Sequence, residues 1–192
     1  MTNEELTEAR TNPEFINYLE KTKDDAIETK NIAALYEVLD SLLILDLEQE
    51  KINTVYENIL KISFENVERI VNSGKKIVLE DDELYYVRSF YEHAIEKWSY
   101  NDLKGAKELF FVLTNIIEDE FLADALSVHL VACSKEFDLD KFYDEKVNTT
   151  STPVDEKYGY FIVSFDFDTK DFLEKNSEIL KTEYTNLKYL LD

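Results

Sequence analysis

Glycine, proline and cysteine are scarce in this sequence, and each scarcity excludes a class of structure. The 192 residues include three glycines and two prolines, whereas all-β folds and phosphate-binding loops need many more turn glycines. We therefore expect long helices joined by short connections. The single cysteine, Cys133, can form no intrachain disulfide, and the opening residues 1–10 are polar, which together favour a reducing, cytoplasmic setting.

Long hydrophobic runs and positive charge are also lacking. Nowhere do about 18 consecutive apolar residues occur, so we expect no membrane-spanning helix. The chain has 21 Lys and Arg against 42 Asp and Glu, a formal net charge of -21 that repels phosphate backbones and anionic lipids. We expect no direct nucleic-acid partner and no membrane partner. A protein or peptide partner fits better, either a basic surface or an apolar segment that needs a soluble escort, although acidity also serves solubility alone.

The residue patterns of common catalytic and metal sites are missing as well. The histidines are His93 and His129, and neither belongs to a Glu-x-x-His or His-x-x-x-His pattern. His129 lies one turn before Cys133, so a nucleophilic Cys-His pair is conceivable, but a free cysteine is more commonly an inert core residue. No phosphate loop, nucleophile elbow or zinc-ligand spacing occurs. We expect no catalytic site, no metal and no cofactor, and interpret the chain as a protein that is not an enzyme.

Apolar residues recur at steps of three and four along most of the chain, the pattern of helices with one buried face. Asn12 and Pro13 are typical of a helix start, with a short helix expected to about Glu20 and the next from about Asp25. Gly74 is suited to a left-handed helix end. The periodic stretches are residues 32–43, 52–62, 84–98, 103–117 and 122–133, and a short helix is expected to begin near residue 138.

The C-terminal part has a different pattern. Residues 147–157 are rich in hydroxyl groups and predict a linker. In 158–167, Phe161, Val163 and Phe165 occupy alternate positions, which predicts one short strand. A last amphipathic helix is expected to follow the strand.

We therefore divide the chain into a helical repeat-like domain, 1–146, a linker, 147–157, and a strand plus C-terminal helix, 158–192, packed on or beside the helical domain. A lone strand cannot satisfy its own backbone hydrogen bonds. It would pair either with residues 77–79 of the same chain, or with a partner's strand, or with a second copy in a homodimer through the strand near Phe161. The sequence leaves these alternatives open.

A weak repeat recurs where one helix ends and the next begins, at Asp46-Leu47, Asp102-Leu103 and Asp138-Leu139. The latter two lie 36 residues apart (138 − 102), close to the period of about 34 in tetratricopeptide repeats. The turn of such a repeat resembles the stretch 98–106, Trp-Ser-Tyr-Asn-Asp-Leu-Lys-Gly-Ala. Asn101 replaces the usual glycine there and tolerates left-handed backbone angles.

The stretch 125–143, which includes Ala132 and Cys133, is similar to the second repeat of the class II chaperones of type III secretion. Those proteins are acidic helical-repeat adaptors that hold translocator segments soluble in a concave groove. The resemblance implies a mostly α fold of tetratricopeptide-like antiparallel hairpins. It also implies an adaptor or chaperone-like function, in which a partner polypeptide is held in a helical groove.

Four residues are our candidates for binding a partner in this groove: Tyr91, Trp98, Phe110 and His129. Amphipathic rings bind peptides at low entropic cost, although packing in the core is the more common use of such side chains. The alternative function is an acidic inhibitor that imitates nucleic acid and blocks a DNA-binding protein. An adaptor needs an apolar concavity, whereas a mimic needs carboxylates spaced regularly on a convex face.

Overall fold

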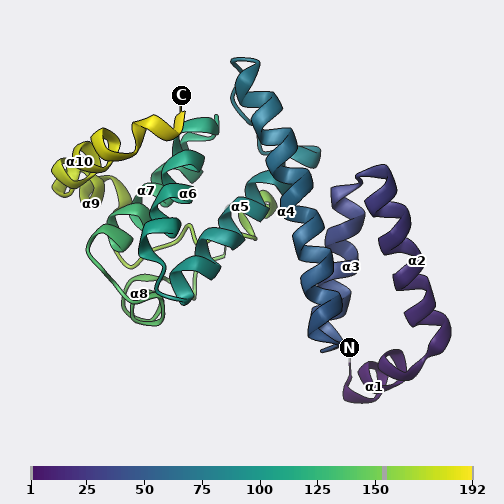
Figure 1. Ribbon diagram of the computed structural model, residues 1–192. Helices are drawn as coiled ribbons and strands as arrows, with labels where there is room; N and C mark the ends of the chain where they lie inside the picture. The colour runs from purple at the N-terminus through teal and green to yellow at the C-terminus, as the bar shows by residue number, and fades with distance from the viewer. Residues whose placement is uncertain (1, 153–154, 192) are drawn as a thin grey trace. The chain divides into compact units, whose positions relative to one another are not determined.

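The computed structural model describes residues 2–152 and 155–191, and within these ranges the chain is mostly helical, as predicted (Figure 1). It forms two compact units, Met1–Glu68 and Arg69–Asp192. The first contains α1 (Asn3–Thr11), α2 (Pro13–Thr29), α3 (Ile32–Ile44) and most of α4 (Gln49–Asn72). The second contains the end of α4, then α5 (Asp81–Ser99), α6 (Leu103–Ile116), α7 (Glu120–Ser134), α8 (Leu139–Lys146), α9 (Thr169–Lys175) and α10 (Ser177–Leu187), with 3-10 turns at Glu156–Tyr158 and Lys188–Leu191.

The start of α2 follows the prediction, but its length does not. The Asn12 side chain accepts the backbone N–H groups of the first turn, and Pro13 is the first helical residue. The helix then continues to Thr29, so the expected break after about Glu20 is wrong. The chain turns only at Lys30, because the next side chain, Asn31, accepts a backbone N–H of α3 and starts that helix.

Four helices end on a non-glycine residue with left-handed backbone angles: Lys30 (φ 54°), Asp46 (φ 49°), Asn101 (φ 60°) and Glu136 (φ 56°). At each corner the N–H of the following residue donates to the carbonyl five positions earlier, at 2.8–3.1 Å. This is the Schellman arrangement, in which glycine usually occupies the left-handed position. The glycine-poor chain therefore makes its tight corners at a cost in backbone strain.

The aspartates of the Asp-Leu repeat have two different roles at these corners. Asp102 and Asp138 cap α6 and α8, because their side chains accept the N–H groups of Gly105 (2.9 Å) and Lys141 (3.1 Å). Asp46 is instead the left-handed residue of its corner. The first member of the repeat therefore matches the others in sequence and not in structure.

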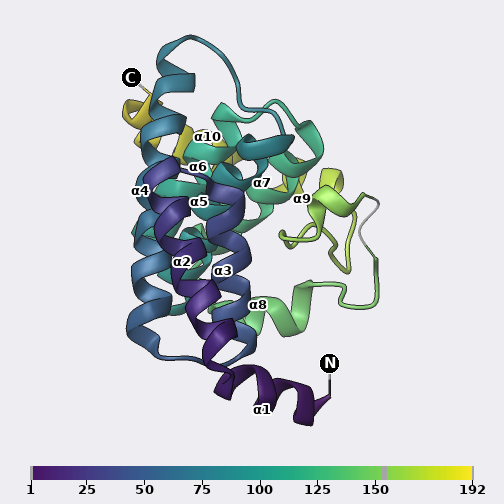
Figure 2. The same cartoon turned by 90° about the vertical axis from the view of Figure 1, so that its right-hand side faces the viewer.

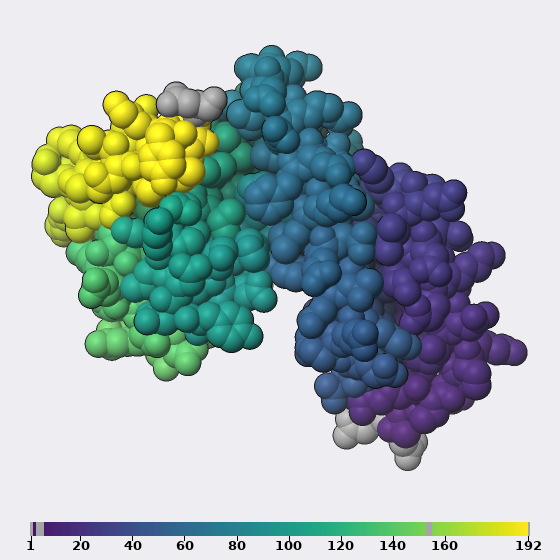
Figure 3. Space-filling model, viewed as in Figure 1, coloured from purple at the N-terminus to yellow at the C-terminus, as the bar shows by residue number. Residues whose placement is uncertain are grey.

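In the second unit α5, α6 and α7 pack consecutively against one another, and α9 and α10 lie against α7 (Figures 1 and 2). The buried Glu183 carboxylate of α10 accepts hydrogen bonds from Lys107 Nζ and Ser134 Oγ, both at 2.9 Å, and so joins α10 to α6 and α7. In Figure 3 the yellow C-terminal residues lie directly against the teal atoms of this unit. Near the same end of α7, Trp98 Nε1 donates to the Phe137 carbonyl (2.8 Å) and joins α5 to the corner between α7 and α8.

The predicted strand at 158–167 is wrong: none of the described residues forms a strand. The segment begins with a 3-10 turn, and a single antiparallel bridge joins Phe165 to Val147. Ile77, the other expected partner, pairs with Ile117 instead. The alternation of apolar residues has another cause, because those side chains pack against helices rather than pointing to the face of a sheet.

The expected linker, 147–157, lies inside the second unit, with Pro153 and Val154 outside the described residues. The expected last helix is broken at Asn176, whose side-chain amide donates to the Phe172 carbonyl at 2.7 Å. The described residues of α9 and α10 therefore fold back onto α6 and α7 of their own unit.

Candidate functional site

The four predicted partner-binding residues come together in the second unit. Tyr91 and Trp98 lie two turns apart on α5, so they share one face of that helix, while Phe110 lies on α6 and His129 on α7. The His129 ring centroid lies 5.1 Å from that of Phe110, 5.7 Å from Tyr91 and 6.1 Å from Trp98. The helical periodicity therefore correctly predicted that these side chains lie on the buried faces of their helices.

The cluster is nevertheless interior. The exposed fractions are 4% for Tyr91, 2% for Trp98 and 0% for both Phe110 and His129. Such burial leaves no open groove at these side chains in this structure. Residues 158–167, which we call the inserted segment, contact Tyr91 and His129, whereas Trp98 contacts Phe142 of α8.

The inserted segment lies on the helices through alternate residues. Phe161, Val163 and Phe165 are buried, whereas Tyr160 and Asp166 are exposed. The Phe161 ring lies 5.2 Å from Tyr91, and the Phe165 ring lies 5.9 Å from His129. The aromatic face of α5 and α7 therefore holds an extended apolar segment, supplied by its own chain.

A buried polar chain connects the helices to the inserted segment. His129 Nδ1 lies 2.7 Å from the Ala125 carbonyl, which assigns the proton to Nδ1 and leaves Nε2 as an acceptor. The Tyr91 hydroxyl lies 3.4 Å from this Nε2 and accepts the N–H of Ile162 at 3.0 Å. Each of these buried groups therefore has a partner, as burial requires.

Burial also sets the protonation of this pair. It lowers the pKa of His129 from the ordinary 6.5 to about 4, against a smaller raising effect of the Ala125 carbonyl. Burial raises the pKa of the Tyr91 hydroxyl, which the Ile162 N–H opposes. Both side chains are therefore neutral near pH 7, as the hydrogen-bonding pattern requires.

Asp119 anchors the start of the inserted segment. Its carboxylate caps α7 through the Leu122 N–H (2.9 Å) and accepts hydrogen bonds from Lys157 Nζ (2.9 Å) and the Tyr158 hydroxyl (2.9 and 3.1 Å). Burial alone raises the pKa of Asp119, but these hydrogen bonds and the Lys157 charge outweigh it and lower the pKa overall. The carboxylate is thus held ionised where α7 and the inserted segment meet.

The conceivable Cys-His pair is not assembled here. His129 directs its two nitrogens to Ala125 and Tyr91. Cys133 is buried, which raises the pKa of its thiol. The buried Cys133 matches an inert core thiol.

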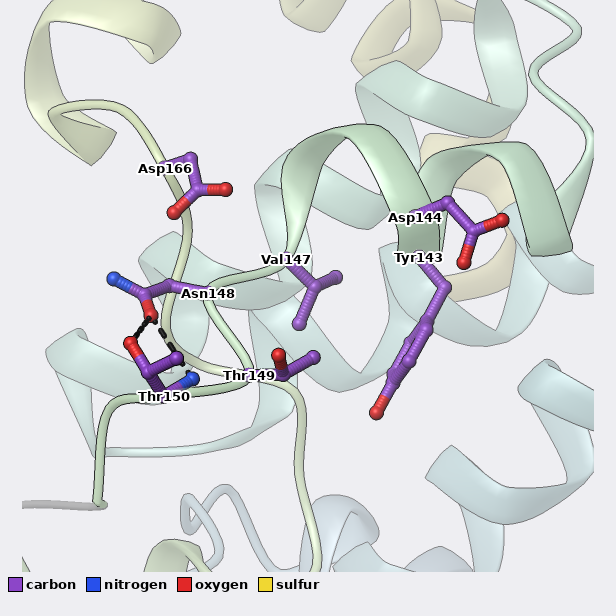
Figure 4. A pocket seen from close by; sticks show the side chains of 7 residues that line it. All are labelled: Tyr143, Asp144, Val147, Asn148, Thr149, Thr150 and Asp166. Atoms are coloured by element: carbon purple, nitrogen blue, oxygen red, sulfur yellow. Dashed lines mark hydrogen bonds between the residues drawn. The ribbon is translucent and has the colours of Figure 1, made fainter.

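A shallow polar recess of about 440 Å³ opens beside the inserted segment, at the end of α8 (Figure 4). Asn148 Oδ1 accepts the backbone N–H (3.1 Å) and hydroxyl (2.8 Å) of Thr150 and closes a local turn. Asp144 and Asp166 lie on opposite sides of Val147 in Figure 4, so their carboxylates do not converge on one point. Across residues 2–152 and 155–191 no group of three or more His, Cys, Asp or Glu side chains could hold a metal ion.

Sequence reasoning missed Phe142, Phe161 and Phe165 as members of this cluster. The rings of Trp98 and Phe142 lie 5.0 Å apart, and those of Phe142 and Phe165 lie 6.2 Å apart. The alternation in the inserted segment was a usable signal, because it marks burial of one side of the segment whether or not the segment belongs to a sheet.

Comparisons with protein-family models, with curated proteins and with solved structures found no match to this chain. No helix in the described part of the chain combines the length and apolar character needed to cross a membrane. The similarity to tetratricopeptide repeats and to secretion chaperones therefore stays a prediction.

Proposed function

We propose that the protein is an adaptor or chaperone-like protein whose second unit binds an extended apolar segment of a partner polypeptide. The inserted segment carries this proposal, since it occupies the aromatic face of α5 and α7 as a bound peptide would. A partner segment with apolar residues at alternate positions would exchange with it. This makes the face a tetratricopeptide-like groove that is covered by the chain itself when no partner is bound.

The side chains of the inserted segment supply most of the attraction that a partner has to match. Full burial of a side chain such as Phe or Val contributes about 1.5–3 kcal/mol. Phe161, Val163 and Phe165 are each at most 9% exposed. A partner that offers three comparable side chains therefore makes equivalent contacts.

The backbone of the inserted segment is held by few hydrogen bonds, which favours exchange. Asn148 N–H donates to the Ser164 carbonyl (3.0 Å) and Asp166 N–H to the Lys146 carbonyl (2.9 Å). The Ile162 N–H donates to Tyr91. A segment tied by so few backbone bonds can open without unfolding the helices beneath it.

Covalent attachment nevertheless gives the inserted segment a large advantage over a free peptide. A tethered segment acts at an effective concentration of about millimolar. The apparent affinity for a free peptide falls in proportion to the small fraction of molecules in which the face is open. Weakening the inserted segment should therefore expose the binding capacity.

The test uses a fluorescein-labelled peptide of residues 155–168 and measures its binding to the full-length chain by anisotropy. In the variant F161S/F165S we expect the peptide to bind at least about tenfold more tightly than to the wild type, because the internal competitor is weakened. The control variant D166S changes an exposed residue of the same segment and should bind as weakly as the wild type. Circular dichroism verifies that each variant stays helical.

A milder variant covers the case in which F161S/F165S loses its helical structure. K157Q leaves the Asp119 cap of α7 in place but removes, from the chain's own segment, the charge that pairs with Asp119. The labelled peptide keeps its lysine, so we expect an intermediate gain in peptide affinity. If folded K157Q and folded F161S/F165S bind the peptide no better than the wild type, the proposal is wrong.

The alternative function, an acidic inhibitor that imitates nucleic acid, is motivated by the net charge of -21. The two functions differ in their response to salt. Capture of a partner by apolar contacts survives high salt, whereas capture by a mimic is abolished because salt screens exposed charges.

The buried Cys133 is compatible with the reducing cytoplasm, where we propose that the protein acts.

A further inference from the structure

A second cavity of the same unit has an aromatic lining that contains no carboxylate, unlike the recess at the end of α8. It encloses about 190 Å³ between the end of α7, α8 and the start of α9. Ala132 and Phe142, both buried, belong to its lining. Three half-buried rings, Phe137, Phe167 and Phe172, complete the apolar lining. The Phe167 and Phe172 rings stack at 4.6 Å, so this wall is continuous.

The charged residues of the lining are both lysines. Lys135 Nζ lies 5.8 Å from the Phe172 ring centroid, and Lys146 Nζ lies 5.8 Å from the Phe137 ring centroid. No carboxylate lines this cavity, in a chain with twice as many acidic as basic residues. The polar recess at the end of α8, in contrast, is lined by Asp144 and Asp166.

The two ammonium groups are weakly neutralised by the protein. Among the described residues Lys135 forms no ion pair, and Lys146 reaches its neighbour Glu145 at 3.7 Å. Lys135 Nζ therefore remains available to an anion from outside, and Lys146 Nζ can turn from the partly exposed Glu145 to the same anion. Positive charge at an apolar cavity therefore sets the chemistry of what fits.

We infer that this cavity is a binding site for an apolar carboxylate, in which a phenyl ring or short branched chain lies a few bonds from the carboxylate group. An apolar cavity of about 150 Å³ can hold benzene, so about 190 Å³ holds one ring and a short stem. The carboxylate group of the ligand then lies beside the ammonium groups of Lys135 and Lys146. Such a group exists in free aryl-alkanoic acids and in the C-terminal residue of a polypeptide.

This inference does not depend on the proposed function. The cavity shares Phe167 with the inserted segment, but the titration uses the chain without a partner peptide, in which this segment is in place. Peptide exchange at Tyr91 and His129 can therefore fail without affecting the cavity. The result for ligand binding at the cavity can therefore be interpreted whatever the result for peptide exchange.

The test uses 3-phenylpropionate as the probe, with its neutral analogue 3-phenylpropanol and its cationic analogue 3-phenylpropylamine. Amide chemical shifts of the full-length chain are followed by NMR during titration. We expect saturable shifts confined to residues 132–146 and 167–172, with a dissociation constant on the order of 0.1–1 mM for so small a ligand. The alcohol should bind about tenfold more weakly, and the amine should not bind.

Matched variants separate the lysines from the cavity itself. K135Q and K146Q should each weaken the acid about threefold, and the double variant about tenfold, without changing the affinity for the alcohol. K141Q is the control, because Lys141 Nζ lies 5.9 Å from the Phe137 ring but does not line the cavity; it should stay within about twofold of wild type. F172A removes one wall and should weaken acid and alcohol alike.

A second pair of probes identifies the source of the carboxylate. A tetrapeptide ending in phenylalanine with a free carboxylate is compared with the same peptide amidated at its C-terminus. Preference for the free peptide over 3-phenylpropionate assigns the site to a polypeptide C-terminus, and the reverse assigns it to a free acid. Absence of saturable shifts with all acid probes, or equal affinity for 3-phenylpropionate and the alcohol, overturns the inference.

Discussion

Replacing His129 by glutamine tests how strongly the buried Tyr91–His129 pair makes the stability of the second unit depend on pH. Glutamine can still offer an amide oxygen to the Tyr91 hydroxyl, but it does not titrate. Burial lowers the pKa of His129 to about 4, whereas in the unfolded chain the ordinary value of 6.5 applies. Between these values the unfolded state binds more protons than the folded state, so stability falls as the pH falls.

The size of the effect follows from the pKa difference. Above about pH 6.5 the imidazole is neutral in both states and contributes no pH dependence. From there down to about pH 4 the wild type should lose about 1.4 kcal/mol per pH unit, or about 3 kcal/mol in all. Glutamine removes this loss but also removes ring packing against Phe110 and Phe165, which we expect to cost about 2 kcal/mol at neutral pH.

The two stability curves should therefore cross near about pH 5, with the variant less stable above the crossing and more stable below it. Urea unfolding between pH 7.5 and pH 4.5 measures this. Trp98 is the one tryptophan of the chain, and its ring lies 6.1 Å from His129, so its fluorescence reports the second unit by itself.

Comparison of two variants removes the contribution of the many carboxylates that titrate in the same range. H93Q removes the other histidine, which lies on α5 and pairs with Glu96 outside the buried cluster. H93Q is the matched control, because it makes the same change from histidine to glutamine at a site outside the cluster. Parallel curves for wild type and H129Q would show that His129 is not held neutral by burial, and the account of the polar chain would then be wrong.

Two further predictions concern the corners and the C-terminal layer. E136G should raise the free energy of unfolding by about 0.5–1 kcal/mol, because the relief of left-handed strain at Glu136 exceeds the entropy that glycine adds to the unfolded chain. Thermal unfolding measures this gain. N101G should gain less stability, since Asn tolerates these angles. E183Q should lower the free energy of unfolding by about 1–2 kcal/mol, because the buried charge that faces Lys107 and Ser134 is lost. Amide hydrogen exchange should accelerate in α10. An equal acceleration in α5 would contradict the idea that Glu183 holds α10 locally.

The helices were predictable because their signals are local. Apolar spacing marked the buried faces, and the cap at Asn12 was identified from the residue types alone. The end of α2 was not, because Lys30 is an unusual residue for a left-handed corner and Asn31 begins the next helix immediately. The corner at Asn101 was marked, since asparagine tolerates left-handed angles. Where a corner lacks both glycine and asparagine, the sequence has little to mark it.

The site was only half predictable, because its outer wall comes from a distant part of the chain. Periodicity places Tyr91 on the same face of α5 as Trp98, but it does not say what covers that face. The cover is residues 158–167, roughly 70 positions later, as the hydrogen bond from Ile162 to Tyr91 shows. Alternation in that segment was interpreted as a strand, since alternation reports which side chains are buried and not what the backbone pairs with.

The Tyr91 hydroxyl also restricts which partner segments can replace the inserted one. A buried hydroxyl that loses a hydrogen-bond partner is destabilised by about 1–3 kcal/mol. In this structure the hydroxyl accepts the Ile162 N–H, and proline has no N–H to donate. A 155–168 peptide with proline in place of Ile162 should therefore bind F161S/F165S at least about fivefold more weakly than the unmodified peptide, as an anisotropy titration would show. In the additional variant Y91F this penalty should shrink, because no hydroxyl is left unsatisfied; an equal penalty in both backgrounds would mean that the proline acts through backbone shape and that Tyr91 does not select the partner.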